Sequence, residues 1–406
     1  MPALEGVDAD PSLLGIFCLG VTPIIYGALL VELAALLLPR WRPLRHAGYT
    51  GRSRLWTAAS ALAMVIAAIQ SYFILRWLES TDPAMGLVPE TATAKALVLA
   101  LPVIGQLLLL QVAHLIDRHG TGHGMSLLIL AFEVPRLVEK AENVAFLARE
   151  GGERGWEGKL LLALMLVVAV VISLARRPTR GWERQPPQPA LLVPAGGVLP
   201  YLATSYLLGL PGALRGLVHI QRWPLKEGTA IYYVLQVVLL VVFSAACTWL
   251  FNRPRRVAEL WRRGPGQLDE TTALAAARTA LRAGFPRALA VGLAFAGIRW
   301  LGVQAEIGLH PIVLVVCGCV VADVVAEWRF RRDHGAVTAV WPIHRTHAVG
   351  PALVLLAESG IPAFPRALRH GGLLSFWGPH VPVNILVPDG RAEEAQSRLR
   401  ALMQGN

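Results

Sequence analysis

GVTPII (residues 20–25) and GVLPYL (residues 197–202) are two short stretches with the same pattern, and each lies inside a long apolar run. Both place a glycine and a proline three residues apart, and proline interrupts the hydrogen-bond ladder of a helix. At membrane depth, interrupted backbone is tolerated only where protein or water covers the freed polar groups. Two such breaks at corresponding places are typical of transport proteins built from two halves around a central pathway.

The composition agrees with a membrane protein. Of the 406 residues, 54% are hydrophobic and 16% charged, whereas ordinary soluble domains carry about 25% charged residues. Long apolar runs, each able to cross about 30 Å of hydrocarbon, recur along most of the chain. They predict an all-α polytopic membrane protein with about nine spans, at about 11–38, 56–76, 95–116, 124–147, 158–175, 198–218, 229–250, 286–304 and 310–327.

The two broken segments are separated by about five of these spans. An odd number of spans per half reverses the orientation of the second half, so Pro23 and Pro200 would face each other across a pseudo-twofold axis. The simpler alternative is that both are incidental kinks, because proline and glycine are common in membrane helices. The similar residues after each proline, IIYGALL and YLATSYLL, favour the repeat.

Arginine marks alternate loops. The loops near 39–55, 176–197, 251–286 and 328–334 are rich in arginine and contain no lysine, and the third includes Arg253, Arg255 and Arg256. Because positive loops stay in the cytoplasm, the N-terminus is expected outside and the C-terminus inside, in a bacterial inner membrane. The net charge of +11 is then explained by the arginines of the cytoplasmic loops. Binding of nucleic acid is not expected, because the arginines are spread over separate loops.

The residues after His334 have a different character. VTAVWPI reads as a strand and HAVGPALVLLAESG as a helix. IPAFPRAL reads as a strand followed by a glycine-rich loop, VPVNILVP as a strand, and DGRAEEAQSRLRALM as an amphipathic helix. We therefore expect a transmembrane domain over residues 1–334 and a small cytoplasmic βαββα domain over residues 335–406. The spacing of the latter loosely resembles the small prokaryotic putative signal-transducing domain, which implies a sensing module without naming its ligand.

Motifs of catalysis are absent from the sequence: it contains no HExxH, GxSxG or P-loop pattern. We therefore expect no enzymatic activity, no cofactor and no metal. Asp117, His119 and His123 lie close together, but a metal site there would need further ligands. Glu32, Glu133 and Asp323 fall within apolar spans, where they either pack against polar groups of other helices or serve a proton relay.

Six stretches together carry a family resemblance: GVTPIIYGA (20–28), GRSRLWTAASALAMVIAAIQS (51–71), GTGHGMSLLIL (120–130), GVLPYLATSYLLGLP (197–211), FNRPRRVAELWRRG (251–264) and VVADVVAEW (320–328). They resemble, in order, segments of the second, third, fifth, seventh, eighth and tenth spans of the SecY family of protein-conducting channels. The first fits the family pattern apart from Ile24, Tyr26 and Gly27. The resemblance runs across residues 11 to 330.

This resemblance implies an hourglass pathway for polypeptides, sealed at its waist by apolar side chains that exclude water. Carried over by motif, the pore ring would comprise Val21, Ile25, Met125, Ile129, Leu202 and Val316. A lateral gate toward lipid would lie between the two broken helices, which carry Gly20, Pro23, Gly197, Pro200 and Pro211. A small subunit similar to SecE is a possible partner.

The sequence also departs from the family pattern. The family's first span has no counterpart here, so the chain is either a reduced paralogue or begins further upstream. The shortened loops at 176–197 and 251–285 argue against the standard docking of a translocation motor or ribosome. Two other functions therefore stay open: a non-conducting scaffold or sensor that signals through its cytoplasmic tail, and a small-molecule transporter, which would need a polar site at mid-membrane that the sequence does not offer.

Overall fold

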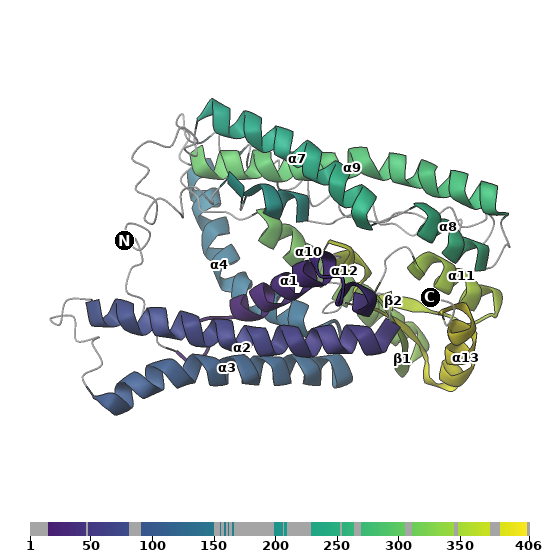
Figure 1. Ribbon diagram of the computed structural model, residues 1–406, viewed down its shortest axis with the longest axis horizontal. Coiled ribbons are helices and arrows are strands. Elements are labelled where there is room, and N and C mark those ends of the chain that lie inside the picture. Colours follow the sequence, from purple (N-terminus) through teal and green to yellow (C-terminus); the bar gives the residue numbers. More distant parts are fainter. Residues whose placement is uncertain are drawn as a thin grey trace. The chain divides into compact units, whose positions relative to one another are not determined.

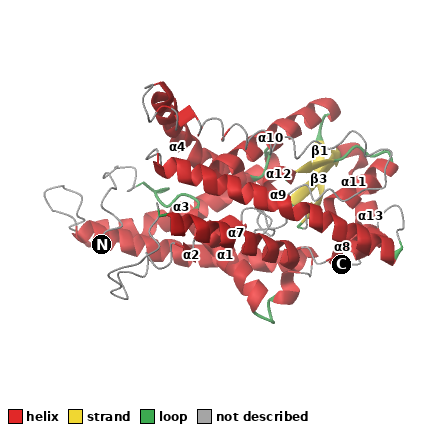
Figure 2. Cartoon of the chain, turned by 90° about the horizontal axis from the view of Figure 1, so that it is seen from above, coloured by secondary structure: helices red, strands yellow, loops and turns green. Residues whose placement is uncertain are grey.

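The computed structural model describes residues 15–45, 48–80, 91–149, 229–251, 254–263, 269–304, 311–344, 348–373 and 382–403, with isolated residues between 155 and 208. These parts are mostly helical, and a small sheet lies near the C-terminal end (Figures 1 and 2). The chain divides into two compact units, one up to Phe132 and one from Glu133 onward.

The first unit contains α1 (Thr22–Leu37), η2 (Arg42–Arg45), α2 (Gly48–Ser80), α3 (Ala92–His119) and the start of α4 (Gly124–Arg149). Helices α2 and α3 run side by side over much of their length (Figure 1). Both are longer than the predicted spans at 56–76 and 95–116, because polar residues at their ends continue the helical hydrogen bonding beyond the apolar windows.

The predicted span at 11–38 is broken, as its glycine and proline indicated. Residues 15–21 form turns, and Gly20 has a φ of 51°, a left-handed conformation that glycine adopts without strain. Helix α1 then begins at Thr22, with Pro23 in its first turn, where the missing N–H has no intrahelical partner to lose. The GVTP stretch therefore ends one segment and starts the next.

Helix α1 packs closely on α2. A Cβ atom added to Gly27 would lie 2.6 Å from the carbonyl oxygen of Ala59 and 2.9 Å from the amide nitrogen of Ala63. The same helices are joined by an ion pair, because Arg52 Nη1 donates to Glu32 Oε1 at 2.9 Å and both side chains are buried. The glycine thus sets the distance between the helices, and the ion pair sets their register.

Replacing Gly27 with alanine should separate α1 from α2. Its methyl group would overlap backbone atoms that cannot rotate away, so we expect a loss of about 1–3 kcal/mol in the free energy of unfolding. The unfolding midpoint in detergent measures the loss. Gly318→Ala is the matched control, because nothing lies within 4 Å of a Cβ at that position. Equal midpoints for both variants would contradict the close packing.

The second unit contains α7 (Ala230–Phe251), α8 (Pro254–Arg263), α9 (Glu270–Gln304) and α10 (Pro311–His334). Helix α9 begins well before the predicted span at 286–304. Asp269 explains the early start, because its carboxylate accepts hydrogen bonds from the Thr272 amide at 3.2 Å and from the Thr271 hydroxyl. These bonds lower the pKa of Asp269 to about 2, so the cap stays charged at any physiological pH.

Three described helical segments are long and apolar enough to cross a membrane: Gly51–Ser80, Ala92–His119 and Ala230–Cys247. Most of the predicted span at 158–175 lies outside the described residues. In the predicted span at 198–218, only residues 199–205, 207 and 208 are described, all of them helical. The count of nine spans therefore stays a prediction.

The C-terminal region has the predicted order of elements. It contains β1 (Val337–Ile343), α11 (Val349–Glu358), β2 (Phe364–Arg366), β3 (Val383–Pro388), and α13 (Ala392–Met403) after the short turn η6 (Asp389–Arg391). One addition was not foreseen: α12 (Leu368–Leu373) occupies the start of the stretch predicted as a glycine-rich loop.

The sheet has the order β1-β3-β2, with both neighbouring pairs antiparallel. The edge strand β1 has an irregular register between Ala339 and Trp341 and contains Pro342. The other edge strand, β2, is three residues long and contains Pro365.

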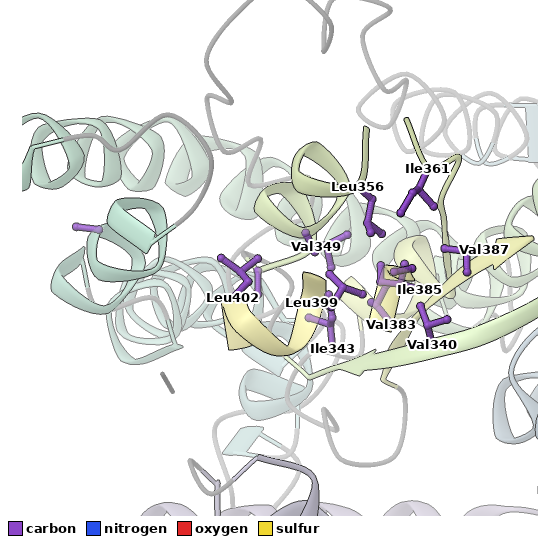
Figure 3. Close-up of a cluster of buried hydrophobic side chains, with 14 of the residues drawn as sticks. Val340, Ile343, Val349, Leu356, Ile361, Val383, Ile385, Val387, Leu399 and Leu402 are labelled. Atoms are coloured by element: carbon purple, nitrogen blue, oxygen red, sulfur yellow. The ribbon is translucent and has the colours of Figure 1, made fainter. Parts of the chain in front are cut away.

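One apolar core links the sheet to helices α11 and α13 (Figure 3). Ile385, Val387, Leu356 and Leu399 lie at its centre and are fully buried. The same core also contains Ala258 of α8 and Ala273 and Ala277 of α9, before the expected domain boundary. The boundary between residues 334 and 335 stays a prediction, and packing continues across it.

Candidate functional site

Four of the six predicted pore-ring residues lie in one apolar cluster of the first unit. Val21 and Met125 are buried, and Ile25 and Ile129 are partly buried and pack against the same cluster. The sequence positions explain the pairing, since residues four apart on a helix share a face. The other buried members of the cluster are Ile24 of α1, Ala63 of α2, Leu109 and Ala113 of α3, and Leu128 of α4.

The other two predicted ring residues belong to the second unit. Leu202 is half-buried in the helical stretch at 199–205, and Val316 is buried on α10. Their membership of one ring with the first four stays a prediction.

The turn before α1 is held by α3. Gln106 is fully buried, and its Nε2 donates to the carbonyl oxygen of Gly20 at 2.6 Å. Beside it, Gly105 leaves room for the backbone of Ile16, which would overlap a Cβ at that position. A helix break leaves carbonyl groups without intrahelical partners, and Gln106 supplies a partner for one of them. The position of Val21, which directly follows Gly20, therefore depends on α3.

The start of α4 is held in a similar way. Asp117, near the end of α3, accepts a hydrogen bond from the Gly124 amide at 2.7 Å. His123 Nδ1 lies 3.2 Å from Ser126 Oγ within the first turn. Gly124 itself has its Cα against the backbone of Ala113, where a Cβ would not fit. The polar residues of DRHGTGHG thus fix the position of Met125, one residue further on.

The second broken helix is described only in part. Pro200 is buried, and its carbonyl oxygen accepts a hydrogen bond from Thr204 Oγ1 at 2.8 Å. Tyr201 packs edge-on against Phe295 of α9, with ring centroids 5.5 Å apart. Gly197 and Pro211 lie outside the described residues, so the lateral gate stays a prediction.

Two of the three predicted cytoplasmic arginines lie on a described helix. Arg255 is exposed on α8, and Arg256 belongs to the same helix, whereas Arg253 lies outside the described residues. Exposure on an amphipathic helix between two long helices is what a cytoplasmic loop residue requires.

Two carboxylates predicted within spans, Glu32 and Asp323, have close polar contacts. Glu32 is paired with Arg52, as described above. Asp323 accepts hydrogen bonds from the backbone amides of Arg369 and His370. Both carboxylates thus pack against polar groups of another element, which is the first of the two alternatives.

Sequence reasoning did not single out Gln106, and it did not assign Asp117 to the α4 cap. A glycine–glutamine pair within an apolar run was the available signal for the first. For the second, an acidic residue seven positions before a helix start is outside the usual capping pattern.

A model of the SecY family matches residues 15–302, more than half of the chain. The chain belongs to the SecY family. Members of this family are membrane channels for protein transport, so the predicted membrane character and fold family are confirmed at that level.

The SecY relatives are distant. The protein translocase subunit SecY of Synechococcus elongatus is 26% identical, with 61% of each chain covered, and that of Thermotoga maritima is 24% identical, with 62% of each chain covered. The chain thus spans less than two thirds of the length of these relatives. A solved SecY structure concerned with the plug domain superposes with a TM-score of 0.47 at 11% identity, covering 78% of this chain and 83% of that one.

Replacing Gln106 with leucine should loosen the turn before α1. The Gly20 carbonyl would lose its donor, and an unsatisfied buried acceptor costs about 1–3 kcal/mol. We expect a lower unfolding midpoint in detergent and faster hydrogen exchange at residues 15–25. Gln111→Leu is the matched control, because Gln111 lies on the exposed side of the same helix. Unchanged exchange at 15–25 in Gln106→Leu would show that α3 does not hold the turn.

Proposed function

We propose that this SecY-family protein forms a polypeptide-conducting pathway through a membrane, sealed at its waist by apolar side chains. The gathering of Val21, Ile25, Met125 and Ile129 in one cluster carries this proposal. These residues follow two chain breaks, at Gly20 and before Gly124, and polar contacts from α3 hold both breaks in place. An apolar constriction excludes ions because water leaves it, while side chains can still move aside for a passing chain.

The remaining parts of the proposal follow from family membership and the sequence. Leu202 and Val316 complete the ring, and the lateral gate opens between α1 and the broken helix that contains Pro200. The protein resides in a bacterial inner membrane, with its N-terminus outside and its C-terminus in the cytoplasm. Its substrate is a polypeptide, its surroundings are lipid, a SecE-like small subunit supports it, and it has no catalytic activity of its own.

A non-conducting scaffold or sensor is the second candidate. One observation favours it: the core of the C-terminal region includes alanines of α8 and α9. A domain that packs on the helices of a family channel is suited to transmit a signal to or from them. The two candidates differ in one measurable property, the passage of ions when the waist is made polar.

The test is a double substitution at the waist, Ile25→Asn and Leu202→Asn. Asparagine adds groups that water can solvate at similar volume, so the seal should become wet and conduct ions. We expect a several-fold rise in ion conductance of purified protein in planar bilayers, at near-normal yield.

Leu30→Asn combined with Leu207→Asn is the matched control, since both leucines are exposed on the same two helical segments. Polar groups facing lipid cost about 1–3 kcal/mol each, so these variants should lose yield without gaining conductance. A well-folded waist variant that conducts no more than the wild type would exclude the channel and leave the scaffold.

The proposed orientation can be tested by cysteine labelling in a background without the four native cysteines. Glu5→Cys should react with an impermeant reagent from outside, and Gln396→Cys only from the cytoplasm. Position 396 is chosen because Gln396 is exposed, whereas the neighbouring Ala395 is fully buried. Labelling of both positions from one side would contradict the odd number of spans.

A further inference from the structure

Two carboxylates of α10 bind the C-terminal region directly. The first is Asp323. It accepts hydrogen bonds from the backbone amides of Arg369 and His370 at 2.9 and 3.1 Å, and its Oδ2 lies 2.7 Å from His370 Nδ1. Arg369 also donates to the carbonyl oxygen of Ala322 at 2.7 Å. The start of α12 is therefore hydrogen-bonded to the middle of α10.

The second carboxylate is Glu327, one helical turn further on. The guanidinium of Arg366, on β2, donates two hydrogen bonds to this carboxylate, from Nε to Oε2 at 3.0 Å and from Nη2 to Oε1 at 2.6 Å. Both side chains are almost completely buried. Arg331 of α10 also contacts Glu327, at 2.9 Å. Next to this pair, the rings of Phe330 and Phe364 stack with centroids 5.4 Å apart.

The two carboxylates lie on the same side of α10 as Val316, a predicted ring residue. Val316, Asp323 and Glu327 are spaced seven and four residues apart, which places them along one stripe of a helix. All three are buried. The C-terminal region therefore binds α10 on the same side of the helix as the predicted ring residue Val316.

We propose that β2 and α12 of the C-terminal region form an intramolecular lock that keeps α10 in the position it has when the pathway is closed. This inference rests on the proposed channel function. Opening requires Val316 to leave the waist, and α10 cannot turn or slide while Asp323 and Glu327 are bound to Arg369, His370 and Arg366. Release of β2 and α12 from α10 is the step that precedes opening.

The energetics of a buried ion pair favour two states of this contact, one fully formed and one fully separated. A buried ion pair gains little net stability over separated, hydrated ions, but a half-broken one leaves a buried charge and is strongly unfavourable. The contact is therefore either fully made or fully released into water. The apolar core shared with α8 and α9 would keep the region attached during release.

A cycle of methionine substitutions in the full-length chain tests the lock. Glu327→Met leaves Arg366 buried without its carboxylate, so the region should detach from α10. The double variant Glu327→Met with Arg366→Met replaces the pair by apolar side chains of similar length, which should keep the region docked. Glu394→Met is the control, because it breaks an ion pair with Arg391 that is exposed. Asp323→Asn tests the second contact independently.

Each variant is measured in two ways: hydrogen exchange of residues 364–373, and ion conductance in planar bilayers. Exchange at α3 reports whether the variant is folded. In Glu327→Met we expect at least severalfold faster exchange at 364–373 and a several-fold higher conductance. Both values should return to the wild-type level in the double variant and stay there in Glu394→Met. If Glu327→Met does not fold, Asp323→Asn is held to the same expectation.

Two results would overturn the lock. Unchanged exchange at 364–373 in folded variants would show that the ion pairs do not hold the region. Faster exchange with wild-type conductance would show an attachment that does not control the pathway, provided that Ile25→Asn with Leu202→Asn does conduct. Failure of that waist variant to conduct would instead reject the channel itself.

Discussion

The structure depends on one constraint: wherever a helix stops inside an apolar environment, its free backbone groups need partners. At the break before α1, the carbonyl of Gly20 meets this requirement by accepting a hydrogen bond from the side chain of Gln106. The start of α4 meets it with Asp117, which accepts from the Gly124 amide. Both partners come from α3. One unbroken helix thus supports the two broken segments that carry the apolar cluster.

Close backbone approach accompanies these two polar contacts and also the Arg52–Glu32 ion pair between α1 and α2. Gly27, Gly105 and Gly124 each lie where an added Cβ would meet backbone atoms of a neighbouring segment. Without side chains in the way, the donor and acceptor groups come within reach, and dispersion between tightly packed atoms adds to the stability. The cost is rigidity. These segments of the first unit therefore have little freedom to rearrange.

Much of the fold was predictable because it follows from local patterns. Apolar runs identified the helices, and Gly20 with Pro23 identified the break before α1. Alternation and turn residues identified all three strands. The turns of α9 that precede the predicted span at 286–304 were not foreseen, because a hydropathy window ignores Asp269, a cap that precedes a polar helical turn. Helix α12 was not predicted because its glycines are typical of a loop. In addition, the carboxylate that accepts a hydrogen bond from its Arg369 amide belongs to Asp323, 46 residues earlier in the sequence.

In the candidate site, too, the features set by local sequence patterns were predictable and those set by long-range contacts were not. The grouping of Val21 with Met125 could be predicted, because both belong to motifs with a family resemblance. The contribution of Gln106 could not, since its partner is a backbone carbonyl that no residue type reveals. The pairing of Glu327 with Arg366 was equally hidden. Each residue alone reads as an ordinary charge near a membrane surface, and only the fold brings them together.

The edges of the C-terminal sheet decide how this region can meet other molecules. Strand β1 has an irregular register and contains Pro342, while β2 is three residues long and contains Pro365. A proline offers no amide donor, and short or irregular edges make poor templates for a further strand. The sheet is thereby protected against edge-to-edge aggregation, a useful property for copies concentrated along one membrane. Binding of an extended peptide by strand addition is disfavoured for the same reason.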